Sequence, residues 1–238
     1  MIVVTLDTET SGTGPDDQVI EVGIIVRDLS LHPASLIIWS SLIKPSVPVH
    51  PAARGAHHIT DKELADAPTI GDVIPQMREH MKGAHAVVGH NLEFDLRMLK
   101  QSGVPDDIIP PAKICTWICA KHLWPNAPGH ANQTLRYWRE LELTASSHRA
   151  LADAFVTHAL LQEMLMEASP EQLIELTETP VLQTKIMFGK HRDKLWSEVD
   201  ISYLRWLLDP QREPPFSDEI RFAARHWLNI AKEEGRSK

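Results

Sequence analysis

The chain has 238 residues, which suffices for one large domain or for one ordinary domain with a small appendage, and either can bury a substantial core. Its apolar share of 43%, charged share of 24% and mean hydropathy of −0.20 are those of a globular protein, and no apolar run reaches the roughly 18 residues that a membrane helix needs. The formal charge of −8 excludes a surface coated with basic residues for non-specific binding of long nucleic acid, although it leaves room for a local site.

The start of the chain and its two cysteines predict a cytoplasmic protein. The first residues run directly into an apolar strand and lack the basic start of a signal peptide. Cys115 and Cys119 lie four residues apart in an apolar stretch that contains tryptophan, which favours buried thiols over a disulfide framework or a metal knuckle. We expect no membrane association and no obligate protein partner.

Strand-like runs come first and are followed by alternating helical and strand-like patterns. Valine and isoleucine with Gly, Pro and Asp turns predict three strands at residues 1–7, 18–28 and 35–45. Apolar spacing then predicts helices at 69–83, 92–103, 131–143 and 146–168, with short strands at 84–91 and at about 112–117. Ser146 or Ser147 is the expected N-cap of the longest helix. The order predicts an α/β fold with a mixed five-stranded sheet flanked by helices.

The composition changes after Ala168. Pro170 can begin a short helix that Pro180 ends, and we expect a linker helix over residues 169–183. We expect residues 184–238 to form a small C-terminal accessory module, and their apolar spacing predicts an amphipathic helix at its end. Residues 1–180 hold 13 Lys and Arg against 23 Asp and Glu, whereas residues 181–238 hold 11 against 9, so the sign of the charge changes between the two parts.

Two acids follow the first predicted strand. Asp7 and Glu9 are two positions apart, so their side chains point to one face of an extended chain while Thr8 and Thr10 point to the other. Two like charges about 4 Å apart repel by roughly 4 kcal/mol at an effective dielectric constant near 20, so the pair is costly unless a cation lies between them. A solvated strand end is the alternative interpretation of this motif alone.

Further candidate residues follow later elements. Asp95 lies one turn beyond Asn91 after the fourth predicted strand. Asp153 lies in the first turns of the longest predicted helix, and His148 precedes it by five residues, at or just before the start of the helix. Each residue alone is also typical of a helix-dipole or surface position. The combination predicts an acidic site with a histidine at one edge of the sheet.

These motifs resemble the DnaQ-like family of 3′-to-5′ exonucleases in its histidine-bearing DEDDh form, which has a ribonuclease H-like fold. The resemblance rests on D-x-E-T-x-G at residues 7–12, H-N-x-x-F-D at 90–95 and H-x-x-x-x-D at 148–153. It also includes the segment that ends in "GAHHIT", which places His57 on the family's histidine. It covers residues 1–168, and the segments "KICTWICAKHLWP" and "FGKHRDKLWSEVD" are similar to one bacterial branch of the family.

The resemblance implies a two-metal hydrolysis of phosphodiester bonds. Asp7, Glu9, Asp95 and Asp153 would hold two divalent ions, and oxygen-only ligands independently favour Mg²⁺ or Mn²⁺ over zinc. His148 would be the general base, a role that suits a side chain titrating near neutral pH. The resemblance further implies binding of the terminal nucleotide by four residues: Thr8, Thr10, His57 and Asn91.

We therefore expect an exodeoxyribonuclease that releases nucleoside monophosphates from DNA 3′ ends in repair or end processing. The alternatives are an exoribonuclease of the same superfamily, because no residue here reports on the 2′-hydroxyl, and a polymerase-associated proofreading or non-catalytic subunit. Two departures from the family pattern are Asp193, where glycine is frequent, and Thr13, where a bulky apolar residue is frequent. The second departure argues against a role for this position in splitting a duplex end.

Overall fold

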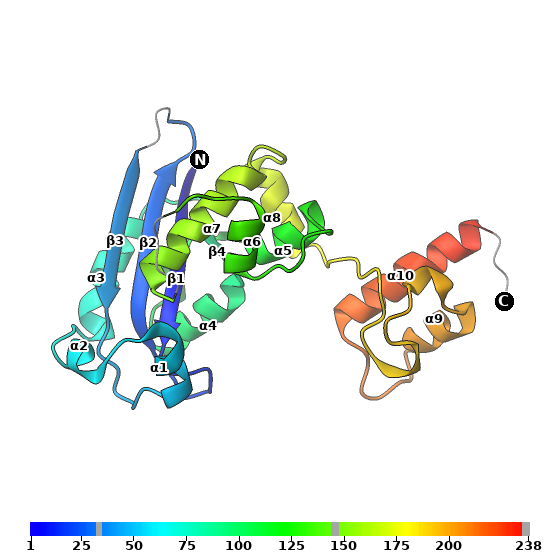
Figure 1. Ribbon diagram of the computed structural model, residues 1–238, viewed down its shortest axis with the longest axis horizontal. Coiled ribbons are helices and arrows are strands. Elements are labelled where there is room, and N and C mark those ends of the chain that lie inside the picture. The colour runs from blue at the N-terminus through cyan, green and yellow to red at the C-terminus, as the bar shows by residue number, and fades with distance from the viewer. Residues whose placement is uncertain (32–34, 144–147, 235–238) are drawn as a thin grey trace. The chain divides into compact units, whose positions relative to one another are not determined.

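A computed structural model of the chain describes residues 1–31, 35–143 and 148–234. The chain divides into two compact units, Met1–Thr177 and Glu178–Lys238 (Figure 1). Our predicted domain boundary at residue 168 and the predicted linker remain predictions. The N-cap expected at Ser146 or Ser147 lies outside the described residues.

The first unit is built on one five-stranded mixed sheet with the strand order β3-β2-β1-β4-β5. Strands β1, β2 and β3 form an antiparallel meander, and β4 and β5 join parallel to β1. The strands span Ile2–Thr10, Val19–Asp28, Leu36–Leu42, Ala86–Gly89 and Ala112–Cys115. The central strands β1 and β4 are buried on both faces, as their continuous Val and Ile runs require. The predicted fold class is confirmed.

Helices cover both faces of this sheet and create two cores. One core includes Leu6, Ile24, Met77 and Met98 between the sheet and the helices α3 and α4. The other includes Val88, Val156, Leu160 and Leu173 against α5, α7 and α8. The helices of the unit span Pro51–His57 (α1), Asp61–Ala65 (α2), Ile70–Met81 (α3), Leu92–Gln101 (α4), Thr116–Leu123 (α5), Asn132–Trp138 (α6), Ala150–Met164 (α7) and Pro170–Glu178 (α8).

The structure corrects the helix and strand predictions at several points. The fifth strand ends at Cys115, and Trp117 belongs to α5, which we did not predict. The helix predicted over residues 131–143 ends at Trp138, and Glu140 beyond it has a positive φ of 55°. Helices α1 and α2 were not predicted, because each is too short to show an apolar period.

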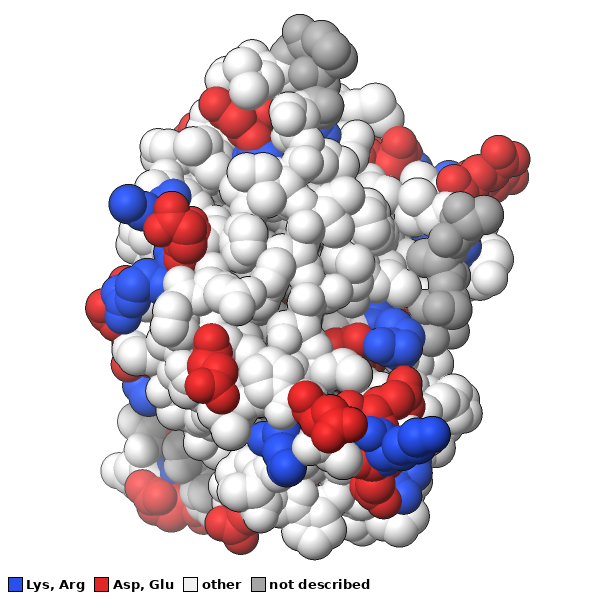
Figure 2. Space-filling model, turned by 90° about the vertical axis from the view of Figure 1, so that its left-hand side faces the viewer, with Lys and Arg blue, Asp and Glu red and all other residues white. Residues whose placement is uncertain are grey.

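Strand β3 forms one edge of the sheet and is unusually apolar for an edge. Leu36, Ile37 and Ile38 are 37%, 56% and 47% exposed. Figure 2 shows the side of the molecule on which β3 lies, with a broad area free of charged side chains and charges around it.

The second unit has a core of its own around Trp196 and Leu204, both essentially inaccessible to solvent. Its helices α9 (Ile201–Leu207) and α10 (Asp218–Glu233) pack on each other, and α10 is the amphipathic helix predicted near the end of the chain. Two short 3₁₀ turns precede them at Gly189–His191 and Trp196–Glu198. None of the helices in the described parts of either unit combines the length and apolarity that a membrane span requires.

Candidate active site

Three of the predicted acids come together. Asp7 and Glu9 lie near the end of β1, and Asp153 lies in the first turn of α7, which packs on β1 and β2. One carboxylate oxygen from each of the three lies within 4.8 Å of the other two. The pairing of β1 with β2 shifts register between Glu9 and Thr10, so the strand is irregular at the cluster. This geometry can hold a metal ion between three carboxylates.

Asp95 reaches the same end of β1 from α4. Its buried carboxylate accepts hydrogen bonds from the amide of Thr8, at 3.0 Å, and from the hydroxyl of Thr8, at 2.7 Å. Asp95 is not one of the three tightly clustered carboxylates, but its charge acts on that of Asp7. The alternation of β1 thus places Asp7 and Glu9 on one side and uses Thr8 to fix a fourth acid. Both donors of Thr8 are occupied by Asp95, and the nucleotide-binding role that we predict for Thr8 remains a prediction.

The acids perturb one another strongly. Burial, together with the charges of Asp95, Asp153 and Glu9, raises the pKa of Asp7 well above its ordinary value. Burial and the charge of Asp153 raise the pKa of Glu9 to about 8, and burial raises the pKa of Asp95 to about 7 against the lowering effect of the Thr8 hydrogen bonds. A site in which several carboxylates resist ionisation lacks a positive charge, and a bound cation would supply it.

Asp153 is oriented from two directions. Its Oδ1 accepts a hydrogen bond of 2.7 Å from the side chain of Gln133 on α6, and its Oδ2 accepts one of 2.7 Å from the backbone amide of His148. His148 has a left-handed φ of 63°, lies two residues before α7 and is exposed. The structure therefore ties the backbone of His148 to the acid cluster, while its side chain is exposed. Each oxygen of Asp153 still has a lone pair for a metal.

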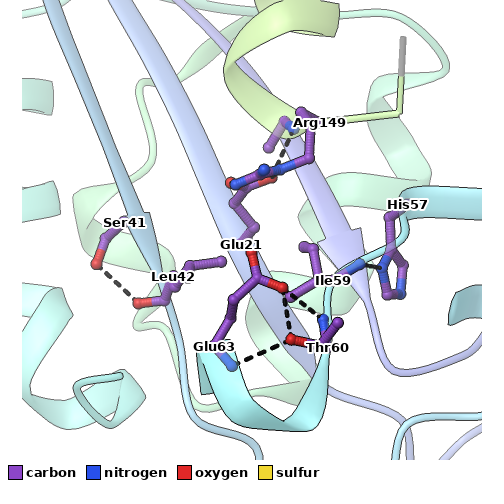
Figure 3. Close-up of polar contacts among 9 residues, drawn as sticks. Glu21, Ser41, Leu42, His57, Ile59, Thr60, Glu63 and Arg149 are labelled. Carbon is purple, nitrogen blue, oxygen red and sulfur yellow. Dashed lines mark hydrogen bonds and ion pairs between the residues drawn. The ribbon is translucent and has the colours of Figure 1, made fainter. Parts of the chain in front are cut away.

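Glu21 on β2 holds the start of α7, and none of the sequence motifs points to this acid. Glu21 pairs with Glu9 across β1 and β2 and is 4% exposed. Its carboxylate binds the guanidinium of Arg149 at 2.6 Å (Figure 3). The same carboxylate accepts a hydrogen bond of 2.9 Å from the amide of Ala150. Arg149 is adjacent to His148, so this ion pair fixes the segment that carries the imidazole. Gly23 on β2 also matters, because a Cβ there would lie 2.4 Å from the backbone nitrogen of Leu151.

His57 and Asn91 lie on other elements. His57 ends α1 and is 2% exposed; its Nδ1 accepts a hydrogen bond of 2.9 Å from the amide of Ile59 (Figure 3). This bond leaves the proton on Nε2, which is buried and has no partner among the described residues. Asn91 caps α4 with a left-handed φ of 65°, is exposed and makes no side-chain capping bond. Thr10 is buried next to the register shift of β1.

The donor set fits hard divalent cations. The cluster offers only carboxylate oxygens, which Mg²⁺ and Mn²⁺ prefer. Arg149, just before the start of α7, is bound to Glu21. The raised pKa values of Asp7 and Glu9 have the same origin, because burial and the neighbouring carboxylates raise both.

The five-stranded mixed sheet and the acids at the end of its first strand are the features on which the chain can be compared with known proteins. The family model RNase_T, described as Exonuclease, matches residues 4–161. This match spans more than half of the chain, and the chain belongs to the exonuclease family. It is a nuclease hydrolase of a divalent-metal-dependent family, with nucleic acid as its substrate class.

Two proteins of known name are similar to this chain in sequence. The chain is 34% identical over 233 residues to Exodeoxyribonuclease 10 of Escherichia coli (strain K12), covering 94% of this chain and 97% of that protein. It is 27% identical over 163 residues to DNA polymerase III subunit epsilon of Treponema pallidum (strain Nichols), covering 67% of this chain and 74% of the other. The resemblance to the DnaQ-like exonucleases, and within them to bacterial exodeoxyribonuclease X, is confirmed.

Solved structures agree with the sequence comparison. A structure titled "Exonuclease X in complex with 5′ overhanging duplex DNA" matches with a TM-score of 0.61 and 31% identity, covering 74% of this chain and 99% of that one. Cell-death related nuclease 4 (CRN-4) matches with a TM-score of 0.57, but its identity of 16% supports the fold alone.

Proposed function

We propose that this exonuclease is a metal-dependent 3′-to-5′ exodeoxyribonuclease that releases nucleoside 5′-monophosphates from DNA 3′ ends. The observation that carries the proposal is the convergence of Asp7, Glu9 and Asp153 within 4.8 Å, with Asp95 acting on the same charge cluster and His148 tied to Asp153. The DNA substrate is supported by the relative named exodeoxyribonuclease and by the related structure with duplex DNA. No observation favours the RNA or non-catalytic alternatives.

Four carboxylates and one imidazole would carry the reaction. Asp7, Glu9, Asp95 and Asp153 would hold two Mg²⁺ or Mn²⁺ ions, which when bound would lower the pKa of the attacking water and neutralise charge on the scissile phosphate. The imidazole of His148 would accept the proton of that water as its oxygen bonds to phosphorus and the bond from phosphorus to O3′ breaks. Glu21, Arg149 and Gln133 would keep His148 and Asp153 in place.

The terminal nucleotide would lie against the residues predicted for it. The buried Nε2–H of His57 has no hydrogen-bond acceptor among the described residues, and an unpaired buried donor costs free energy. A sugar hydroxyl or a base oxygen of the nucleotide could accept this hydrogen bond. Thr10 ends β1, and Asn91 precedes the start of α4. The amide of Thr8 is bound to Asp95, so Thr8 would contact the nucleotide through other atoms. We keep these four as the proposed nucleotide contacts.

We propose residues 1–168 as the exonuclease domain, 169–183 as a linker and 184–238 as the accessory module. The buried and free thiols of Cys115 and Cys119 support the proposed cytoplasmic location, and DNA repair or end processing is the role that we propose for the enzyme there.

A time course on matched oligonucleotides tests the function. DNA and RNA of the same sequence, labelled at the 5′ end, are incubated with Mg²⁺ or Mn²⁺ as single strands, as duplexes and with a blocked 3′ end. The expected result is stepwise shortening of DNA from the free 3′ end, release of nucleoside 5′-monophosphates and complete inhibition by EDTA. Faster shortening of RNA than of DNA would overturn the assignment of DNA as substrate, and inertness on both would overturn the activity.

A further inference from the structure

The second unit carries an exposed aromatic side chain, Trp206, that lies outside its core, beside rings that belong to the core or pack against it. Trp196 is completely buried and belongs to that core, whereas Trp206 on α9 is 44% exposed. Trp206 stacks on Tyr203, with ring centroids 5.2 Å apart and planes inclined by 27°, and meets Phe216 edge-on at 5.5 Å. An exposed tryptophan held by two other rings is a rigid platform rather than a loose surface side chain.

These rings line a pocket of about 560 Å³. Its walls include Phe188, Lys190, Asp200, Tyr203, Trp206 and Phe216. The volume is in the range of small-molecule sites, and flat rings are the usual partners of flat ligands. Asp200 makes no capping bond to α9, so its carboxylate is available to accept a hydrogen bond inside the pocket.

Two cations lie on the same rings. The guanidinium carbon of Arg212 is 4.2 Å from the centre of the Trp206 ring and 4.5 Å from that of Phe216, and the ammonium of Lys190 is 5.4 Å from the centre of Tyr203. Neither cation forms an ion pair with a carboxylate in the described part of the chain, and the buried Nε of Arg212 has no hydrogen-bond partner there. The segment 185–194 that borders the pocket holds four Lys and Arg against one Asp.

We propose that this pocket binds an unpaired segment of nucleic acid, with a base taking the place of the Arg212 guanidinium on the Trp206 ring and neighbouring phosphates bound by Arg212 and Lys190. Stacking on aromatic rings combined with cations that follow the backbone is how single strands are held without sequence preference. The local positive charge favours an anionic strand over an apolar peptide. The proposal rests on the proposed function in one respect, since the strand would be the substrate of the first unit; the chain connects the two units and raises the effective concentration of a bound strand.

Binding of a blocked strand by the full-length protein tests the pocket. The probe is a fluorescein-labelled oligothymidylate of about 12 nucleotides with a 3′-phosphate, titrated in EDTA and followed by fluorescence anisotropy. We expect Trp206→Ala to weaken binding about tenfold, Trp206→Phe to weaken it less, and Arg212→Gln to weaken it and flatten its salt dependence. Arg225→Gln, an exposed arginine of α10 outside the pocket, is the matched control and should bind like the parent protein.

Equal binding by the parent protein, Trp206→Ala and Arg212→Gln would overturn the proposal, whatever else the pocket holds. Circular dichroism and melting of each variant separate lost binding from lost folding, and Arg212→Gln is the second variant should Trp206→Ala unfold. Hydrolysis of a trinucleotide in Mg²⁺ separates the two hypotheses. If Trp206→Ala still cleaves the trinucleotide but binds the oligothymidylate about tenfold more weakly, the result supports the pocket. If the parent protein does not cleave the trinucleotide, that result would overturn only the proposed function.

Discussion

His148 is the one proposed active-site residue that combines an exposed side chain with a backbone tied to the acid cluster. Because its amide, not its ring, holds Asp153, His148→Ala removes the base and keeps the cluster intact. We expect kcat to fall about 10² to 10⁴-fold while Mn²⁺ still raises the melting temperature. Single-turnover rates on 5′-labelled DNA and thermal melts measure both.

Asp7→Asn is the contrasting variant, since it should lose activity together with the response to Mn²⁺. His226→Ala in the second unit is the matched control and should leave both unchanged. A His148→Ala protein with the parent rate would show that another group accepts the proton.

A buried histidine of the core, His158, predicts a pH dependence of stability. Its Nδ1 lies 3.0 Å from the hydroxyl of Thr5, and burial lowers the pKa of His158 to about 4. The unfolded chain, with a histidine pKa near 6.5, binds more protons between pH 4 and 6.5, so the stability that the neutral ring contributes is present above pH 6.5 and is lost as pH falls toward 4. The loss amounts to about 3 kcal/mol.

His158→Gln should therefore show a flatter decline of the free energy of unfolding over this range, measured by urea denaturation at several pH values. The comparison with the parent protein is essential, because the raised pKa values of Glu9 and Asp95 act with the opposite sign in the same range. Parallel curves for the two proteins would contradict the assignment to His158.

The start of α7 is the element on which the site depends most. Strand β2 approaches it through Gly23 and anchors it through Glu21, whose carboxylate binds Arg149 and the amide of Ala150. We expect Glu21→Gln and Arg149→Gln each to lower kcat about tenfold at saturating Mn²⁺, because the segment carrying His148 loses its anchor. We expect the double variant to lose scarcely more than either single variant, because both single changes remove the same ion pair.

Rates are measured well below the melting temperature of each variant, so that a loss of folding does not imitate a loss of rate. Glu171→Gln, an exposed acid on α8, is the matched control. Additive losses in the double variant would show that Glu21 and Arg149 act separately.

The elements themselves followed from the sequence to different degrees. The strands β1 to β3 and the helices α3, α4 and α10 could be predicted, because Val and Ile runs and apolar periods near 3.6 residues leave little choice. The short strands β4 and β5 were predicted from apolar runs of wider extent. Helix α7 is buried on nearly all sides, so the length of its apolar segment, not an apolar period, predicts a helix. Helix α5 could not be predicted, because Thr116–Leu123 continues the apolar run of β5 and such a run looks alike in a strand and in a buried helix. Only the packing of α5 on α7 distinguishes the two.

At the scale of the whole molecule, the proposed metal binding would be coupled to folding. Ions that bind only the folded protein stabilise it by about 2.7 kcal/mol at a hundredfold excess over their dissociation constant. For a protein of this size we expect Mn²⁺ to raise the melting temperature by about 5 to 10 °C. Differential scanning calorimetry with Mn²⁺ and with EDTA measures the rise.

Asp153→Ala should respond less than the parent protein, whereas Asp16→Asn, an exposed acid of the same unit, should respond fully. An Asp153→Ala protein that responds like the parent would remove Asp153 from the proposed ligands.

The sequence by itself determined the sheet, the family resemblance and the five residues proposed for the chemistry, because strand alternation and motif spacing are local properties that can be read along one chain. It could not identify Glu21, Gly23 or Gln133, since each acts through a neighbour far away in the chain, and it could not separate buried Trp196 from exposed Trp206. Those distinctions depend on which surfaces meet in three dimensions. Only the tertiary structure decided that one tryptophan builds a core while the other forms the wall of a pocket.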